Sequence, residues 1–295
     1  MIEKLNNHLD INRMYEKSKK LIEGDMISMD DFKGFYDKQV LRKDKNYVRE
    51  REKNFKERTG DEKMIDKLAI MLEGIFYEQV ELSDWMGPNT FTIKTSRFDD
   101  IYNGVDCVLE FQEPDSPYLA LAVDLTISDD LSGKFKRIKE EIKKGYLARV
   151  KYFISDRAEI SKDQPSAFLG KNSCYCSPYQ YRGELLNIPR IIIGISRKTV
   201  MDLGFLWIEN KKKKLAHHWV QFQILDEIII QLGQFKRFAQ KANQGKLVRV
   251  YSQIEKVVSK IIDDKNSYLS DPGERDNIFE SIKDGINILE KARMS

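Results

Sequence analysis

Two aspartates stand in segments that otherwise have the composition of buried β-strands. Asp106 lies in the apolar segment 105–111, and Asp124 lies in the apolar segment 119–127. An unpaired carboxylate inside a protein costs free energy, because its charge loses its hydration. Each aspartate therefore needs a basic partner, a metal ion or contact with water.

The spacing of the two aspartates predicts that they lie close together. The loop between the segments, 112–118, is centred on residue 115, and each aspartate is nine residues from that centre (115 − 106 = 9 and 124 − 115 = 9). Antiparallel pairing across this loop places both side chains on one face, at one end of the strand pair. Ala120 and Ala122 share the face of Asp124 and leave space beside it.

Two carboxylates on neighbouring strands are a suitable oxygen-ligand pair for Mg²⁺ or Mn²⁺. The alternative is that both acids lie at the edge of the sheet and form salt bridges with lysine or arginine side chains. A zinc site is less favoured. Cys174 and Cys176 form a C-x-C pair, but no second cysteine or histidine pair stands at the spacing of a zinc site.

The rhythm of apolar residues predicts the elements that position these acids. A helix over 61–82, with Asp61 as its N-cap, precedes them, and Glu73 lies beside its apolar stripe. Alternating segments then predict strands, and Gly145 ends the helix that follows the acids. The predicted strands cover 90–95, 105–111, 118–128, 148–154 and 188–195, the further helices 131–145, 199–207, 219–243, 247–263 and 276–291, the turn 99–104 and the long loop 156–183.

The order of these elements indicates an α/β fold. We expect a core over 61–200 with a mixed central sheet flanked by helices, a charged helical extension over 1–60 and a helical C-terminal region over 201–295. Hydrophobic residues make up 41% of the chain, which is enough for a substantial core. The amphipathic C-terminal helices offer a surface through which a homodimer can form.

The residues around the two aspartates resemble the restriction-endonuclease-like PD-(D/E)xK nuclease superfamily. The resemblance rests on Asp106 at the end of DDIYNGVD, on Asp124 in LALAVDLT, and on the helices before and after them. It covers about residues 61–200. It implies a helix, a three-strand meander, a helix and a further strand. It also implies that the two acids bind a divalent metal ion, joined by a glutamate of the first helix, here Glu73.

One position departs from the pattern of the superfamily. The lysine that stands two residues after the second acid falls on Thr126, which carries no charge. The resemblance implies that the following helix can supply a substitute. We predict Lys134 for this role, with Lys136, Arg137 and Lys139 as alternatives. The predicted catalytic residues are Glu73, Asp106, Asp124 and Lys134, and the predicted ligands of Mg²⁺ or Mn²⁺ are Asp106, Asp124 and the main-chain carbonyl of Leu125.

Metal-assisted hydrolysis of a phosphodiester is the reaction that this set of residues implies. A bound cation lowers the pKa of a water molecule and neutralises charge on the phosphate, and the ammonium group of Lys134 positions that water or stabilises the transition state. Asp99 and Asp100 precede the predicted turn. We expect them to cap it through side-chain hydrogen bonds rather than to bind metal.

Basic side chains are concentrated in places where they can contact nucleic acid. The segment 38–58 contains nine Lys or Arg against four Asp or Glu. It either follows a phosphate backbone or, as favoured here, is a solvated helix face with i,i+4 pairs such as Glu52 and Lys56. Tyrosines in the long loop either stack on unpaired bases or fix the loop. The loop residues are Tyr175, Tyr179, Tyr181 and the neighbouring Arg182. Further basic side chains occur in segments 134–151, 211–214 and 235–249.

Two hypotheses about function follow. The first is a divalent-metal-dependent endonuclease or exonuclease that acts on nucleic acid, with DNA favoured. The second is a catalytically inactive protein of the same fold that binds nucleic acid or acts as a protein scaffold, which Thr126 favours. The first residues lack the apolar core of a signal peptide, and no run of 18 apolar residues occurs. We therefore expect a cytoplasmic protein without a membrane partner.

Overall fold

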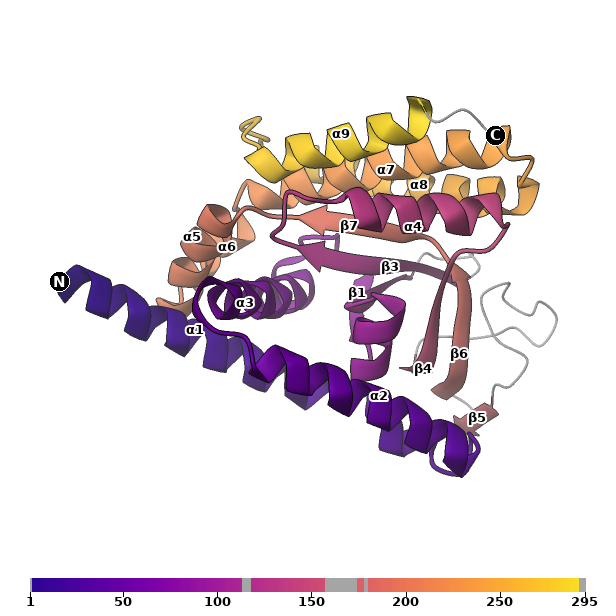
Figure 1. Cartoon of the computed structure of the whole chain (residues 1–295). Coiled ribbons are helices and arrows are strands. Elements are labelled where there is room, and N and C mark those ends of the chain that lie inside the picture. Colours follow the sequence, from indigo (N-terminus) through magenta and orange to yellow (C-terminus); the bar gives the residue numbers. More distant parts are fainter. Residues whose placement is uncertain (1, 113–117, 157–173, 178–179, 292–295) are drawn as a thin grey trace.

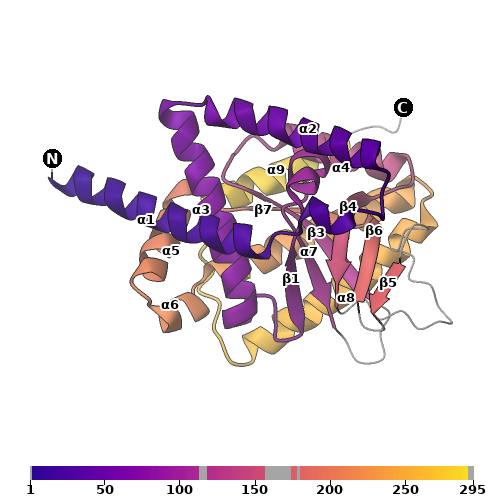
Figure 2. The same ribbon diagram turned by 90° about the horizontal axis from the view of Figure 1, so that it is seen from below.

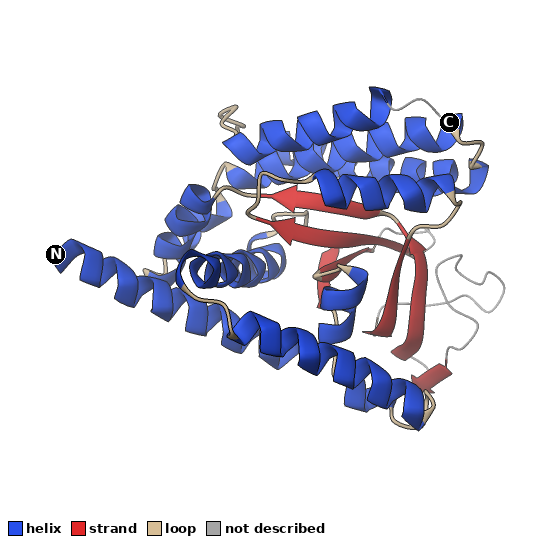
Figure 3. Cartoon of the chain, in the orientation of Figure 1, coloured by secondary structure: helices blue, strands red, loops and turns tan. Residues whose placement is uncertain are grey.

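Two β-sheets lie between groups of helices in the computed structural model, which describes residues 2–112, 118–156, 174–177 and 180–291 (Figure 1; Figure 3). The central sheet has the strand order β1–β2–β3–β7, in which the first three strands form an antiparallel meander and β7 pairs parallel to β3. The prediction of an α/β fold with a mixed sheet is therefore confirmed. These strands are β1 (Thr90–Lys94), β2 (Cys107–Phe111), β3 (Leu119–Thr126) and β7 (Arg190–Gly194).

A smaller antiparallel sheet stands between β3 and β7 along the chain. Its order is β4–β6–β5, with β4 (Ala148–Ser155), β5 (Cys174–Ser177) and β6 (Gln180–Ile188). The predicted loop over 156–183 is therefore wrong from Cys174 to Ser177 and from Gln180 onward. In β6 buried and half-buried side chains alternate, but several of these residues are polar or small, so the sequence shows no alternation of apolar and polar residues. Pro189, which has no N–H for a strand ladder, divides the predicted strand 188–195 in two.

Helices cover both faces of the central sheet (Figure 1; Figure 2). Helices α1, α2 and α3 lie on one side, and α4, α7, α8 and α9 lie on the other. Helix α3 contacts β1 and β3, whereas α7 contacts β7. The helices on the first side, with the short ones beside them, are α1 (Ile2–Asp25), η1 (Met29–Phe32), α2 (Lys38–Lys56), α3 (Gly60–Ser83), α5 (Arg197–Ile208) and α6 (Lys212–Ala216). Those on the second side are α4 (Ser132–Lys143), α7 (Val220–Lys241), α8 (Gly245–Asn266) and α9 (Asn277–Lys291).

The start of α3 differs from the sequence prediction. The helix begins at Gly60, and Thr59 occupies its N-cap position, so the prediction of Asp61 as N-cap is wrong. Asp61 lies instead in the first turn, where its negative charge interacts favourably with the N-terminal end of the helix dipole. The predicted end of α4 is confirmed, because Gly145 follows the last turn in a left-handed conformation.

One cluster of buried side chains includes residues from all three predicted segments of the chain. Met14 of α1, Phe76 of α3 and Ile282 of α9 belong to it. The apolar face of α9, which suggested a homodimer, contacts α4, α7 and β7 of the same chain. Dimerisation and the domain boundaries near residues 60 and 200 therefore stay predictions.

Side chains of α7 complete the hydrogen bonding of β7, the edge strand of the central sheet. Gln231 accepts a hydrogen bond from the amide of Ile192 at 2.9 Å and donates one to the carbonyl of the same residue at 2.7 Å. Glu227, one turn away, accepts from the amide of Gly194 at 2.9 Å. These contacts explain the polar residues inside the apolar run of α7, because an uncovered edge is open to pairing with another strand.

Replacing Glu227 with glutamine is expected to reduce the pH dependence of stability. Burial raises the pKa of Glu227 well above its ordinary value, although hydrogen bonds from Gly194 and Gln223 oppose the shift. The folded chain thus keeps a proton that the unfolded chain releases above about pH 4.3, so stability falls as pH rises toward the folded pKa. We expect the free energy of urea unfolding to decrease less between about pH 5 and about pH 8 in Glu227→Gln than in wild type. Equal decreases would contradict this assignment.

Candidate functional site

The register of the central sheet places Asp106 and Asp124 opposite each other. Cys107 is opposite Val123 in the β2–β3 ladder, and continuing that register by one residue pairs 106 with 124 (107 + 123 = 106 + 124). The amide of Asp106 donates a hydrogen bond to the carbonyl of Val123 at 2.9 Å. The spacing argument from the sequence therefore gives the observed register. Both residues lie at the end of the sheet where β1 and β3 finish and β2 begins.

Asp106 is a buried carboxylate without a basic partner. Its side chain accepts a hydrogen bond from the amide of Leu125 at 2.6 Å, and the residue is 8% exposed. No lysine, arginine or histidine in the described part of the chain forms a salt bridge with it. Burial and then the charges of Glu73, Asp100 and Asp124 raise the pKa of Asp106 well above its ordinary value, against a smaller opposing effect of Lys94. The local electrostatics thus favour a cation or a proton at this carboxylate.

Each of the three neighbouring acids holds one basic side chain. Glu73 of α3 pairs with Lys94 of β1 at 2.5 Å, and Lys94 is only 3% exposed. Burial lowers the pKa of Lys94, but the charges of Glu73, Asp100 and Asp106 outweigh this and raise it above its ordinary value. Asp100 pairs with Arg97, and Asp124 pairs with Lys134. These residues form an acidic cluster of four acids (Glu73, Asp100, Asp106 and Asp124) and three bases (Lys94, Arg97 and Lys134). Asp106 is the acid of the cluster that has no basic partner among the described residues.

Lys134 contacts the site as the sequence predicts. Its ammonium group bonds to the carboxylate of Asp124, and its side chain is 31% exposed. Thr126, where the resemblance implies a lysine, accepts a hydrogen bond from the amide of Ser128 at 3.2 Å and so supports the turn that leads into α4. Among the alternatives, Arg137 bonds instead to Glu141 at 3.3 Å. Of the four predicted candidates, only Lys134 forms an ion pair with an acid of the site in the described structure.

Lys94 and Arg97 were not expected in the cluster from the sequence, and Asp100 was expected only to cap a turn. Lys94 shares a strand face with Thr90 and Thr92, and this polar face of β1 was the available signal. Arg97 and Asp100 form an i,i+3 pair, a spacing that a helical backbone brings together. The predicted turn over 99–104 is in fact a π-helical turn, η2 (Asp99–Asn103), and so the assumption of a simple turn concealed the pair. Turns of this rare type occur often at functional sites.

The two neighbouring acids of η2 have different roles. Asp99 is fully buried and accepts hydrogen bonds from the amides of Lys151 and Tyr152 in β4, at 2.6 and 3.0 Å. It also accepts from the side chains of Ser96 and Asn103, but no main-chain amide of the described turn donates to it, so the expected capping of the turn is not observed. Asp100 pairs instead with Arg97, and its charge acts on Asp106.

Gly104 fixes the chain between η2 and Asp106. Its φ of +60° lies in the left-handed region, and its carbonyl accepts a hydrogen bond from Arg190. A β-carbon at this position would lie 2.7 Å from a guanidinium nitrogen of Arg137. The position therefore favours glycine for both its backbone conformation and the space around it.

Gly104→Ala is expected to lower the free energy of unfolding by about 1–3 kcal/mol, since the left-handed conformation and the displaced arginine both cost energy. We also expect reduced activity, because Asp106 follows two residues later. Urea unfolding measures the first effect. A Gly133→Ala variant is a matched control, because nothing lies within 4 Å of a β-carbon at that helical position. Equal stabilities of the two variants would contradict the role of Gly104.

The donor atoms of the site fit a hard divalent cation. Carboxylate oxygens are the preferred protein ligands of Mg²⁺ and Mn²⁺, and Asp106 supplies a carboxylate without a basic partner. Leu125, predicted to contribute its carbonyl, donates its amide to Asp106, and its role as a ligand stays a prediction. In the ranges that the structure describes, no three His, Cys, Asp or Glu side chains are already grouped as in a metal site. Glu73 and Asp124 are instead bonded to lysines.

The other predicted binding residues have mixed outcomes. Tyr181 is 1% exposed and its hydroxyl donates to the carbonyl of Glu184 at 2.7 Å, so of the two alternatives, stacking on a base is wrong for it and fixing its segment agrees with the structure. Arg182 donates to the carbonyl of Asp31 at 2.9 Å, which joins β6 to η1. Tyr179 and the side chains of Tyr175, Cys174 and Cys176 lie outside the described residues. The predicted pair of Glu52 with Lys56 is wrong, because Glu52 contacts Arg97 at 3.2 Å.

Comparison of the chain with protein-family models, with curated proteins and with solved structures gave no match. No helix in the described segments has an apolar stretch long enough to cross a membrane.

Proposed function

We propose that the protein is a divalent-metal-dependent hydrolase of phosphodiester bonds in nucleic acid, with a restriction-endonuclease-like core. The observation that carries this proposal is the unpaired, buried carboxylate of Asp106 opposite Asp124. Burying a charged carboxylate without a partner costs free energy, and carboxylates in such surroundings occur often at functional sites. A divalent cation bound by both aspartates would neutralise this charge.

The order of elements supports the restriction-endonuclease-like part of the proposal. Helix α3, the meander β1–β2–β3 and helix α4 follow the order that the resemblance implies, whereas the strand directly after α4 is β4, which belongs to the small sheet, and β7 completes the central sheet later in the chain. The small sheet β4–β6–β5 is an addition between α4 and β7. Glu73 lies on α3, Asp106 lies directly before β2 and Asp124 lies on β3, and these positions support the proposal.

The chemistry follows from the groups at the end of the sheet. Asp106, Asp124 and the carbonyl of Leu125 would hold Mg²⁺ or Mn²⁺, which lowers the pKa of a water molecule and neutralises phosphate charge. The amide of Leu125 orients the carboxylate of Asp106. Lys134, partly exposed beside Asp124, provides a positive charge for the scissile phosphate. Lys94 holds Glu73 in place at the inner side of the cluster.

A second candidate function is a binding protein of the same fold without hydrolytic activity. The ion pair between Asp124 and Lys134 favours it, because this lysine satisfies a carboxylate that the hydrolase needs for the cation. Thr126 in place of the motif lysine also favours a protein without hydrolytic activity. In this case the basic residues of α2 and α4 serve binding alone.

Nicking of supercoiled plasmid in Mg²⁺ or Mn²⁺ distinguishes the two candidates. We expect wild type to nick the plasmid and Asp124→Asn to lose this activity. Asp202→Asn on α5 is the matched control, because Asp202 is an exposed acid paired with Lys198 and lies outside the cluster. Equal traces from wild type and Asp124→Asn would exclude the hydrolase. Single-stranded DNA and RNA substrates should be tested in parallel.

A further inference from the structure

Tyr102 is an exposed aromatic side chain on the same π-helical turn as Asp100. It is 57% exposed, whereas one face of its ring stacks on Phe98 with a centroid separation of 4.9 Å and an angle of 16°. Tyr47 of α2 contacts it edge-on at 5.4 Å and 84°. The ring of Tyr102 is therefore supported by two aromatic neighbours while much of its surface is open to solvent.

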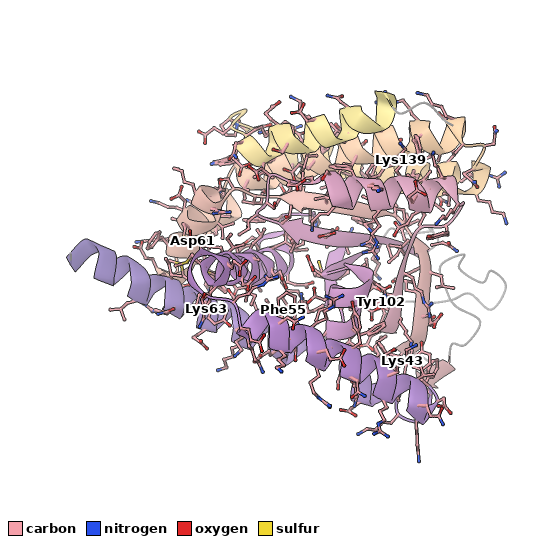
Figure 4. All side chains as sticks on the ribbon, viewed as in Figure 1. Lys43, Phe55, Asp61, Lys63, Tyr102 and Lys139 are labelled. Carbon is pink, nitrogen blue, oxygen red and sulfur yellow. The ribbon has the colours of Figure 1, made fainter. Side chains whose placement is uncertain are left out.

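A basic stripe of α2 adjoins this ring. Lys43, Tyr47 and Arg51 are spaced four residues apart and so lie on one side of the helix. The guanidinium group of Arg51 lies 5.3 Å from the centre of the Tyr47 ring. Neither Lys43 nor Arg51 forms a salt bridge with any described acid, in contrast to Lys45, which pairs with Asp30. Figure 4 places Lys43 on α2 and Tyr102 on the turn above it. A shallow hollow beside Tyr47 is lined by Gln39, Arg42, Lys43, Asn46 and Glu50.

The position of this surface relates it to the acidic cluster. Tyr102 is two residues from Asp100 and four residues from Asp106 along the chain. On the α2 side, Glu52 follows Arg51 directly and contacts Arg97, the partner of Asp100. The turn η2 therefore carries both Tyr102 and Asp100, and α2 carries both the basic stripe and a contact to the partner of Asp100.

We infer that Tyr102, together with the stripe Lys43–Tyr47–Arg51, binds a single-stranded segment of nucleic acid. One unpaired base stacks on the open surface of Tyr102, and Lys43 and Arg51 contact phosphates. Stacking on an aromatic ring requires an exposed base face, which a base inside a duplex does not offer. Lysine and arginine bind phosphate regardless of sequence. The inference rests on the proposed function for its ligand class, and it specifies which form of nucleic acid is presented to the acids.

Fluorescence anisotropy of labelled oligonucleotides tests the inference without cleavage. The full chain is titrated, in EDTA, into single strands of about 15 nucleotides and into a blunt duplex of the same sequence. We expect Tyr102→Ala to weaken binding to single strands by about 5- to 150-fold and to leave duplex binding unchanged. Tyr102→Phe keeps the ring and should retain wild-type affinity. DNA and RNA strands, measured separately, identify the preferred sugar.

A matched control is Tyr268→Ala, which removes another exposed tyrosine, 65% exposed and just beyond α8. We expect it to bind single strands as wild type does. The inference is overturned if Tyr102→Ala binds single strands like wild type, if its duplex binding falls equally, or if wild type binds no single strand. Plasmid nicking is measured separately on the same protein preparations, in Mg²⁺ or Mn²⁺ without EDTA. Tyr102-dependent binding without Asp124-dependent nicking would reject only the hydrolase, and the reverse pattern would reject only this inference.

Discussion

Asp106→Asn is expected to reduce metal-dependent cleavage by about 1,000-fold or more, equivalent to ~4 kcal/mol of activation free energy. The same substitution should leave the metal-free chain at least as stable as wild type near pH 8. The reason is the raised pKa of Asp106, because a carboxylate whose ionised form is disfavoured in the fold costs stability wherever it is ionised. Asparagine removes the charge, and its amide oxygen can still accept the hydrogen bond from Leu125. Cleavage kinetics and thermal unfolding measure the two effects.

Asp44→Asn provides the contrast for this prediction. Asp44 is also 8% exposed, but it pairs with Lys151 and accepts a hydrogen bond from the hydroxyl of Tyr152 at 2.7 Å. Its neutralisation should therefore cost about 1–3 kcal/mol of stability. If Asp106→Asn destabilised the chain as much as Asp44→Asn, Asp106 would be a structural acid. The same stability change in both variants would remove the main support for a cation site.

Lys134→Ala is expected to lower cleavage by about 100-fold, because it removes the positive charge beside Asp124. The free energy of unfolding should fall by about 1–3 kcal/mol, because Lys134 is partly exposed but Asp124 then keeps a buried carboxylate without its basic partner. The variant is thus predicted to lose activity while it still folds. Single-turnover cleavage and urea unfolding of the same preparations measure both.

The matched control for this variant is Lys136→Ala, which removes the same charge from an exposed position on the same helix. We expect Lys136→Ala to cleave at close to the wild-type rate. Equal losses in both variants would mean that α4 acts through its overall charge and that Lys134 has no specific role. Lys94→Met tests the role of a lysine in cleavage less well. Lys94 is buried with Glu73, and breaking such a pair costs about 3–5 kcal/mol of stability, so a loss of activity could reflect unfolding.

Local patterns were sufficient to predict the meander of the central sheet. The alternation around Asp106 and Asp124 and the length of the loop between them gave the correct register, since antiparallel neighbours joined by a short loop leave little freedom in pairing. Lys134 could be predicted because its position one turn into α4 places it at the same end of the sheet as Asp124. These relations depend on residues close in sequence.

The missed features depend on contacts between distant segments. The strand β6 was read as loop because its partner β4 lies across a long gap in sequence, and pairing with β4 rather than its own composition makes it a strand. Similarly, Lys94 of β1 is a site residue only because α3 places Glu73 beside it. The pair Arg97–Asp100 depends on a π-helical turn that no propensity predicts. Buried polar residues of α7 became interpretable only when β7 was seen as an edge strand.

Calorimetric titration of Mn²⁺ into the full-length chain tests the central claim most directly, namely that Asp106 and Asp124 bind one cation together. We expect saturable binding to wild type and an affinity at least about tenfold weaker, ~1.4 kcal/mol, in both Asp106→Asn and Asp124→Asn. Asp202→Asn should bind Mn²⁺ as wild type does. Unchanged Mn²⁺ affinity in either of the two site variants, or no binding to wild type, would contradict a shared cation.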